Sequence, residues 1–268
     1  MGGAHRGLGT SNDTVVLNPA GMALWRRYAV DLTYRYGLAD DLTHLSVSAV
    51  DSKTGPVAGG LAYTHTRGDG SGADPSLHRI YLAAAYAITE RLALGINGVN
   101  IRGTYREQAQ PVAGGGQSDE TLREVSLYSG GFGLSAVLEG GLTLGFVYNN
   151  AIKTREPSFA PPRVGAGFSF SSGAAVLAGD VLADIRDPND KAWSYHVGGE
   201  YVAAQTFPLR IGYEQTPFTD ADETRKDEKI LTGGLGWLLN GGSLNASFQR
   251  SLKRQRNWSV AGSLVFFL

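Results

Sequence analysis

Hydrophobic and polar residues alternate with a period of two along most of this chain. The clearest example is the C-terminal segment 258–268, whose apolar face carries Trp258, Val260, Leu264, Phe266 and Leu268. This period is typical of β-strands, and the segments have the length of about ten residues that a tilted strand needs to cross a bilayer. A strand of this kind at the chain end leaves an open edge unless it pairs to close a barrel. The pattern therefore predicts an all-β protein, specifically a transmembrane antiparallel β-barrel.

Alternation and turn residues together indicate about fourteen strands, and an even number is expected for a bacterial single-chain barrel. Short connections such as 89–91 and 139–141 alternate with longer ones such as 106–124 and 153–162. Outer-membrane barrels have short periplasmic turns and longer outer loops, so this order places both chain ends in the periplasm. Tyr and Trp near the strand ends favour a membrane barrel over a water-soluble β-sandwich or β-helix.

The N-terminal segment 1–26 does not alternate, whereas 27–268 reads as one barrel without an internal linker. The run 6–13 is rich in glycine, and further along Asn18 is suited to cap a short helix whose first position would be Pro19. We expect segment 1–26 to fold back into the lumen as a plug or hatch. Its candidate residues are Arg6, Gly7, Gly9, Asp13, Asn18, Pro19, Ala20 and Gly21.

A resemblance to known families rests on the run from Arg6-Gly-Leu-Gly9 through Asp13 to Asn18-Pro19-Ala20-Gly21 and on the strand that follows it. This start resembles the FadL family of outer-membrane transporters for long-chain fatty acids and hydrocarbons, and it is also similar to PorV-type barrels that assist a secretion system. Both resemblances imply fourteen strands with the N-terminal segment inside the barrel. The FadL resemblance also implies an apolar capture site built by long loops, but loop 106–124 is rich in Gly, Gln and Glu and departs from that pattern.

The predicted inward faces of the strands carry charges of both signs. This polar lumen network consists of Asp31, Arg35, Arg102, Arg163, Asp180, Asp184, His196, Glu200, Arg210 and Glu214. Buried charges must be paired or hydrated, so these residues form either a lattice that packs the lumen around the N-terminal segment or the lining of a wet channel. A selectivity filter would use rings of one sign. The balance of signs favours the lattice.

One predicted strand changes phase. Its apolar positions have even numbers from Leu92 to Ile96 and odd numbers from Val99 to Tyr105. An extra residue near Gly98 would return both halves to the lipid side, as a β-bulge does. The FadL resemblance implies that a kinked wall strand makes a lateral opening for an apolar ligand, and the candidates for this gap are Gly95, Asn97, Gly98 and Val99. The alternative is a bulge that only adds curvature.

Composition and motifs exclude several classes of function. The chain has no Cys, and therefore no disulfide, thiolate metal site or cysteine nucleophile. A net charge of −1 argues against nucleic-acid binding. The five histidines lack metal-ligand spacing, and nucleophile-elbow and phosphate-binding motifs are missing. We expect no enzymatic activity, no metal and no cofactor. The first residues lack the apolar core of a signal peptide, which we presume was removed before this numbering begins.

The sequence thus predicts an outer-membrane barrel that moves small hydrophobic molecules of the fatty-acid or hydrocarbon type, with 1–26 as a hatch and the Gly98 region as an exit. The alternative is a closed PorV-type barrel that anchors or scaffolds a secretion or envelope complex. A porin for polar solutes would need an open lumen without a plug. Expected partners are outer-membrane lipid or lipopolysaccharide, a small hydrophobic ligand, or other envelope proteins. Transport requires an apolar lumen pocket, for which the candidate lining is Val16, Leu17, Met22, Leu127 and Leu182.

Overall fold

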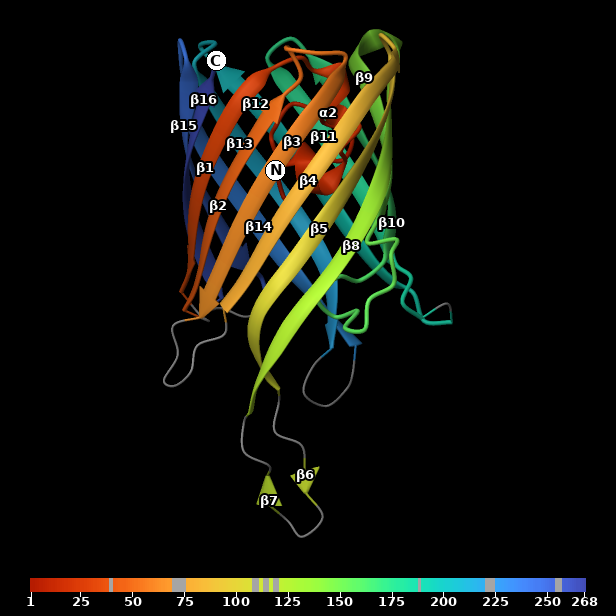
Figure 1. The fold of residues 1–268 in the computed structure, drawn as a ribbon. Helices are drawn as coiled ribbons and strands as arrows, with labels where there is room; N and C mark the ends of the chain where they lie inside the picture. Colours follow the sequence, from red (N-terminus) through yellow and green to blue (C-terminus); the bar gives the residue numbers. More distant parts are fainter. Residues whose placement is uncertain are drawn as a thin grey trace.

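The fold is a closed antiparallel barrel. The computed structural model describes residues 1–38, 41–68, 76–107, 111–112, 116–117, 121–187, 189–219, 225–253 and 257–268. Within these residues fourteen strands close the barrel: each pairs with its neighbours along the chain, and the last strand pairs with the first (Figure 1). The predicted barrel of fourteen strands is confirmed. No helix among the described residues is long and apolar enough to span a membrane.

The strands of the barrel differ in length from 8 to 17 residues. They are β1 (Tyr28–Gly37), β2 (Leu42–Asp51), β3 (Val57–Gly68), β4 (Ser76–Thr89), β5 (Leu92–Glu107), β8 (Thr121–Val137), β9 (Leu142–Asn149), β10 (Arg163–Ser172), β11 (Ala175–Asp184), β12 (Ala192–Ala203), β13 (Phe207–Thr219), β14 (Arg225–Leu239), β15 (Gly242–Ser251) and β16 (Trp258–Phe267). Two short strands, β6 (Pro111–Val112) and β7 (Gly116–Gln117), pair separately between β5 and β8. Residues 108–110, 113–115 and 118–120 of the predicted loop 106–124 lie outside the described residues.

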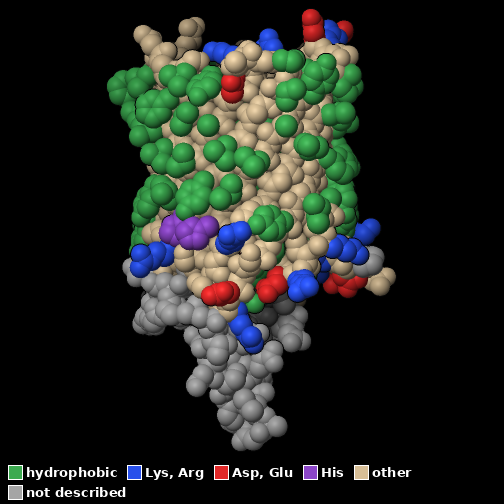
Figure 2. All heavy atoms as spheres, viewed as in Figure 1, with side chains coloured by type: hydrophobic (Ala, Val, Ile, Leu, Met, Phe, Trp, Pro, Cys, Tyr) green, Lys and Arg blue, Asp and Glu red, His purple; other side chains and the backbone are tan. Residues whose placement is uncertain are grey.

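Exposure alternates along the strands as the sequence pattern predicts. On β3, for example, Leu61 is 47% exposed and faces outward, whereas Ala62 is 3% exposed and faces the lumen. On the face shown in Figure 2, hydrophobic side chains form a band across the barrel, and most charged side chains lie toward its two edges. This is the exterior of a transmembrane barrel.

The two ends of the barrel have different connections. Short turns, including the 3₁₀ turn η1 (Glu139–Gly141), join the strands at the end where β16 finishes, and we call this the turn end. The longer connections, such as 150–162 between β9 and β10, lie at the opposite end, which we call the loop end (Figure 1). The alternation of short and long connections follows the sequence prediction.

The N-terminal segment lies inside the barrel and contains two one-turn helices, α1 (Thr14–Leu17) and α2 (Gly21–Leu24) (Figure 1). Val15 and Met22, both fully buried, pack on one sector of the wall. Their partners are the inward-facing side chains Val50, Ala58, Ala62 and Ala85 of β2, β3 and β4. Burial of these apolar groups holds the helices against that sector.

Asn18 follows α1, and α2 begins at Gly21 with Ala20 as its N-cap, two residues later than the predicted start at Pro19. The Asn18 side-chain oxygen Oδ1 accepts a hydrogen bond from Ala20 N at 3.3 Å, which is a local contact at this turn. The Asn18 amide also donates hydrogen bonds to Arg6 O at 2.8 Å and to Ser135 Oγ of β8 at 3.0 Å. The side chain therefore joins the turn between the two helices to the wall.

Inward-facing glycines on six strands let the N-terminal backbone approach the wall. They are Gly95, Gly133, Gly145, Gly167, Gly198 and Gly212. A Cβ atom at each of them would lie 3.1 Å or less from an atom of residues 1–20. At Gly95, for example, it would lie 2.5 Å from the carbonyl carbon of Pro19. Close packing of two backbones explains glycines that would weaken an ordinary strand.

The β-bulge predicted near Gly98 is wrong. The pairing of β5 runs without a shift through Leu82↔Gly98 on the β4 side and Gly98↔Gly130 on the β8 side, and the irregularity lies at Ala87/Thr89 instead. Strict alternation therefore continues along β5 and turns Val99 into the lumen. The phase change in the sequence arises because the lumen face of this sector is itself apolar.

Arg102 is not part of the lumen network, which corrects the prediction. Because β5 has no bulge, Arg102 shares the outward parity of Ile96, and its guanidinium Nη2 donates a hydrogen bond to Tyr128 Oη at 2.9 Å. Asn100 has the same outward parity. Arg102 lies near the loop end of the strand, where a charge can leave the hydrocarbon region.

Candidate functional site

A cavity of about 300 Å³ lies in the lumen between the N-terminal segment and the 150–162 connection. Its volume is at the lower end of the range of roughly 300–1,000 Å³ that is usual for small-molecule sites. The lining residues are Arg6, Val16, Leu17, Tyr81, Asn97, Val99, Asn149, Asn150, Ser158, Phe159, Pro161 and Arg163. They come from the N-terminal segment, from β4, β5, β9 and β10, and from one loop-end connection.

One side of this lumen cavity is apolar. Val99 and Phe159 line it and belong to a larger cluster, whose buried members are Val99, Ile101, Val125, Leu127 and Ala160. The Phe159 ring meets the Tyr105 ring edge-on, with 4.8 Å between the ring centroids. The strand members of the cluster are inward-facing residues of β5 and β8, so the cluster forms an apolar sector that continues from the cavity toward the loop end.

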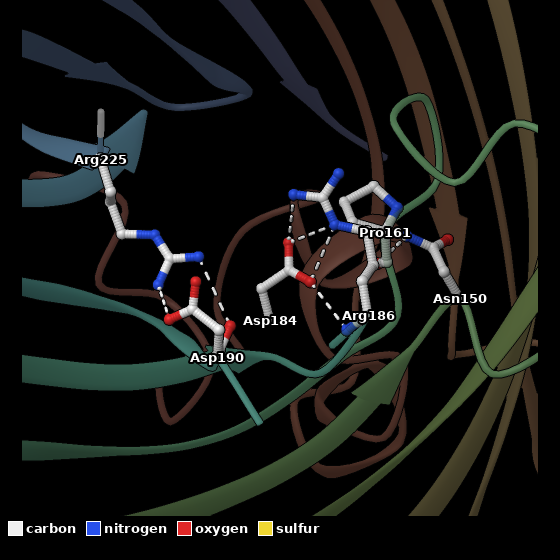
Figure 3. A network of polar contacts seen from close by, with 6 residues as sticks. All are labelled: Asn150, Pro161, Asp184, Arg186, Asp190 and Arg225. Atoms are coloured by element: carbon white, nitrogen blue, oxygen red, sulfur yellow. Dashed lines mark hydrogen bonds and ion pairs between the residues drawn. The ribbon is translucent and has the colours of Figure 1, made fainter. Parts of the chain in front are cut away.

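The 150–162 connection folds inward over the cavity. Ala151 N donates a hydrogen bond to Gly130 O at 2.6 Å, and Ser129 Oγ donates one to Ile152 O at 2.9 Å. Inside the connection, Asn150 Nδ2 donates to Pro161 O at 3.0 Å, and this pair lies close to the ion pair of Arg186 with Asp184 (Figure 3). These contacts fix Phe159 over the cavity.

The opposite side of the cavity is polar. Arg6 and Arg163 contribute guanidinium groups, and Asn149 contributes an amide. Asn149 Oδ1 and Arg6 Nε are buried without a hydrogen-bond partner. Buried polar atoms normally have partners, so these two leave the polar side of the cavity incompletely satisfied.

Asp180 anchors the N-terminal segment to β11. Its Oδ2 accepts hydrogen bonds from Arg6 Nη1 at 3.1 Å, from Arg6 N at 3.1 Å and from His5 N at 2.9 Å. The side chains of Arg6 and Asp180 are 7% and 0% exposed. This buried ion pair is the strongest polar contact between the segment and the wall, because it is both charged and shielded from water.

The other predicted hatch residues all lie inside the barrel. Gly7 O accepts a hydrogen bond from Ser169 Oγ of β10 at 2.9 Å. Asp13 Oδ2 accepts one from Ser11 Oγ at 3.0 Å, which is a local contact. The remaining members pack by close approach: Gly9 against Gly21, and Pro19 and Ala20 against Gly95.

Nine members of the predicted lumen network face inward. They are Asp31, Arg35, Arg163, Asp180, Asp184, His196, Glu200, Arg210 and Glu214. Several of them form local pairs. Arg210 Nε lies 2.5 Å from Glu200 Oε2, Arg186 Nη2 lies 3.0 Å from Asp184 Oδ2, and His196 Nδ1 donates to Gly2 O at 2.8 Å. Among the described residues no group of three or more His, Asp or Glu is placed to hold a metal ion.

The candidate gap residues lie on both faces of β5. Gly95, Asn97 and Val99 face the lumen, and Gly98 faces outward. Asn97 Nδ2 donates hydrogen bonds to Val15 O at 3.1 Å and Val16 O at 3.3 Å. Because β5 pairs with both neighbours throughout this stretch, the wall has no opening there.

Sequence reasoning found part of the cavity lining. Val16 and Leu17 line the cavity as expected, whereas Met22, Leu127 and Leu182 are buried but do not line it. It missed Tyr81, Asn149 and Phe159, which line the cavity, and Arg27, which holds the N-terminal segment. For Tyr81 the available signal was the alternation along its strand, which places it on the inward face between the outward-facing Ile80 and Leu82. Arg27 donates to Gly9 O at 2.7 Å and to Ser11 O at 2.6 Å.

Acidification is expected to loosen the N-terminal segment. Burial lowers the pKa of the His5 imidazole below its ordinary value of 6.5, against the raising effect of the nearby Asp13 carboxylate. A released segment takes up a proton near pH 6.5 while the docked one does not, so docking weakens as pH falls below about 6.5. Proteolysis of residues 1–8 measured between pH 8 and pH 5.5 should accelerate toward low pH. The His5→Asn variant should flatten this profile, and an unchanged profile would contradict the assignment.

Comparisons with known proteins give similarities in structure alone. No family model matches the sequence, and no curated protein sequence matches it. Among solved structures, the CymD monoaromatic hydrocarbon channel has a TM-score of 0.69 at 13% identity, over 100% of this chain and 95% of that one. A Pseudomonas aeruginosa FadL homologue has a TM-score of 0.67 at 14% identity, over 98% of this chain and 94% of that one. The Pseudomonas putida toluene transporter TodX has a TM-score of 0.65 at 14% identity, over 99% of this chain and 94% of that one. The chain therefore has the FadL-like barrel fold.

Proposed function

We propose that this protein is an outer-membrane channel for the uptake of small hydrophobic molecules of the fatty-acid or hydrocarbon type. The observation that carries the proposal is the lumen cavity, with its apolar side at Val99 and Phe159 and its polar side at Arg6 and Arg163. The FadL-like fold supports it, because the similar structures include channels for toluene and other aromatic hydrocarbons. In the outer membrane the loop end faces outside and the turn end faces the periplasm.

The proposal assigns residues 1–26 as a hatch and residues 27–268 as the barrel wall. The hatch lies on the turn-end side of the cavity, so a ligand can pass toward the periplasm only when the hatch moves. Two different kinds of contact hold it: apolar packing on β2–β4 and the polar anchor at Asp180. Loss of the polar anchor releases one side while the other stays attached, as a hinged movement requires.

A lateral exit is better placed at β8 than at Gly98. β9 pairs with β8 only from Phe132↔Tyr148 to Val137↔Thr143, whereas β8 continues to Thr121. Beyond Phe132 the β9 side of β8 is joined to the 150–162 connection by the Ala151 and Ser129 hydrogen bonds described above. A lateral opening here would break fewer hydrogen bonds than an opening between two strands that pair along their whole length.

The PorV-type scaffold receives no support from the similar structures named above.

The function is tested by filling the cavity. Val99→Trp places a large ring in the lumen, and Ile96→Trp places the same ring on the lipid side of the same strand. Native mass spectrometry of barrels purified in mild detergent and incubated with a fatty acid or toluene should show bound ligand in wild type and Ile96→Trp, and about tenfold less in Val99→Trp. Equal binding in both variants would place the ligand outside the lumen cavity and overturn the proposal.

A further inference from the structure

Three basic side chains form a row across the outer surface near the loop end. His65 of β3 pairs with His78 of β4, which pairs with Arg102 of β5, and all three face outward. The two imidazole rings stack with 4.4 Å between their centroids and 5° between their planes. Arg67 also faces outward, one step closer to the loop end. Figure 2 shows the histidines beside basic side chains, just past the edge of the hydrophobic band.

Aromatic hydroxyl groups tie this basic row to the wall. Tyr63 Oη and His78 Nδ1 lie 2.8 Å apart, and Tyr128 Oη accepts the hydrogen bond from Arg102. Tyrosine is enriched where the hydrocarbon region meets the headgroups. The row therefore lies at headgroup level, where the Arg102 guanidinium and the two imidazoles meet lipid phosphates instead of acyl chains. The carboxylate Glu124 lies in the next row toward the loop end.

An apolar groove of about 720 Å³ lies toward the turn end from the basic row, on these three strands and on the neighbouring β1 and β2, which add Tyr28, Ala49 and the carboxylate Asp51. Its outward-facing lining on β3, β4 and β5 is Gly59, Leu61, Leu82, Ala84, Ile96 and Gly98. The glycines leave open space along this surface: a Cβ on Gly59 would have no neighbour within 4 Å, and one on Gly98 only Ser129 O at 3.9 Å. Leu61 is four residues from His65, or about 13 Å along a strand. An acyl chain spans such a distance.

We propose that the outer surface of β3, β4 and β5 binds a phosphorylated glycolipid of the outer leaflet, with a phosphate on the row His65, His78 and Arg102 and an acyl chain in the groove below. The match of a guanidinium flanked by two polar imidazoles to an anionic headgroup, continued by an apolar groove on the same strands, distinguishes this surface from general lipid contact. The proposal depends on the outer-membrane orientation given above, but not on transport.

The headgroup half of the proposal is tested by removing charge. The double variant His78→Gln/Arg102→Gln is compared with Lys229→Gln/Arg250→Gln, which removes outward-facing charges from β14 and β15 on the far side of the barrel. Binding of bisphosphorylated hexa-acylated lipid A is measured by native mass spectrometry. We expect about tenfold weaker binding in the first variant and less than twofold change in the control. If both double variants lost lipid A binding equally, the effect would come from the overall charge at this end of the barrel and the proposal would be overturned.

The acyl half is tested by filling the groove. Gly98→Leu occupies it, whereas Gly233→Leu adds the same side chain to the surface of β14, where a Cβ has no neighbour within 4 Å. Only Gly98→Leu should weaken lipid A binding, about fivefold. This variant keeps the headgroup row intact and tests the site even if the charge variant fails to fold. If dephosphorylated lipid A bound as tightly as phosphorylated lipid A, the phosphate site would be contradicted. If phosphatidylglycerol bound as tightly, the preference for a glycolipid would be contradicted. These readouts do not involve ligand uptake, so failure of the channel proposal leaves them unchanged.

Discussion

Replacement of Asp180 by alanine is expected to release the N-terminal segment and expose the Arg6–Gly7 bond to trypsin. The change removes three hydrogen bonds and leaves the Arg6 guanidinium buried without its counterion. Breaking a buried ion pair by removing one partner costs about 3–5 kcal/mol, so residues 1–8 should detach from the wall. The barrel ladder does not depend on this carboxylate, so the wall should stay folded. Mass spectrometry of the trypsin digest should find fragments that begin at Gly7.

The matched control is Asp190→Ala. Asp190 also pairs with an arginine, Arg225, but their side chains are 66% and 42% exposed (Figure 3). Exposed ion pairs contribute little to stability, so this variant should protect Arg6 as wild type does. Cleavage after Arg6 that is equally slow in the Asp180→Ala variant would show that the ion pair does not hold the segment.

The Gly95→Ala variant is expected to displace the segment from the opposite side. The added Cβ would lie 2.5 Å from the Pro19 carbonyl carbon, and a backbone atom cannot move aside by changing a rotamer. Overpacking of this kind costs about 1–3 kcal/mol. Hydrogen exchange of residues 12–24 should therefore accelerate by about one order of magnitude, with a parallel rise in conductance in planar bilayers.

Gly98→Ala on the same strand is the control. It changes the strand propensity of β5 in the same way as Gly95→Ala but adds no atom to the lumen. Gly98 faces outward, and a Cβ there would approach no atom closer than 3.9 Å. Exchange and conductance should remain at wild-type values. If both alanine variants open the barrel equally, the effect belongs to β5 itself and not to contact with the segment.

Periodicity predicted the barrel because lipid outside and a crowded lumen inside place different demands on alternate residues. This logic fails where the lumen is also apolar. Ile101 and Val125 are inward-facing members of the apolar cluster, so the alternation of β5 could not show which parity faces lipid. The predicted bulge at Gly98 and the inward placement of Arg102 both followed from reading every apolar residue as lipid-facing.

The cavity could be predicted only in part, because its lining comes from segments far apart in sequence. Val16 and Leu17 were found from their place in the N-terminal segment. Phe159 was not, because nothing in the run 150–162 shows that this connection folds inward instead of extending into solvent. Its position depends on tertiary contacts, namely the Tyr105 ring and the hydrogen bonds to β8.

The central claim is that ligand passes through the lumen when the segment 1–26 moves. An engineered disulfide tests it directly, since the chain has no other cysteine. In the variant Asn18→Cys/Gly133→Cys, the new Cβ at position 133 lies 3.2 Å from the present Asn18 Cγ, a separation that suits a disulfide bond. The measurement is uptake of labelled fatty acid and labelled toluene by cells that express this variant, before and after reduction. We predict at least about fivefold slower uptake in the oxidised form and recovery on reduction, whereas equal uptake in both forms would contradict the claim.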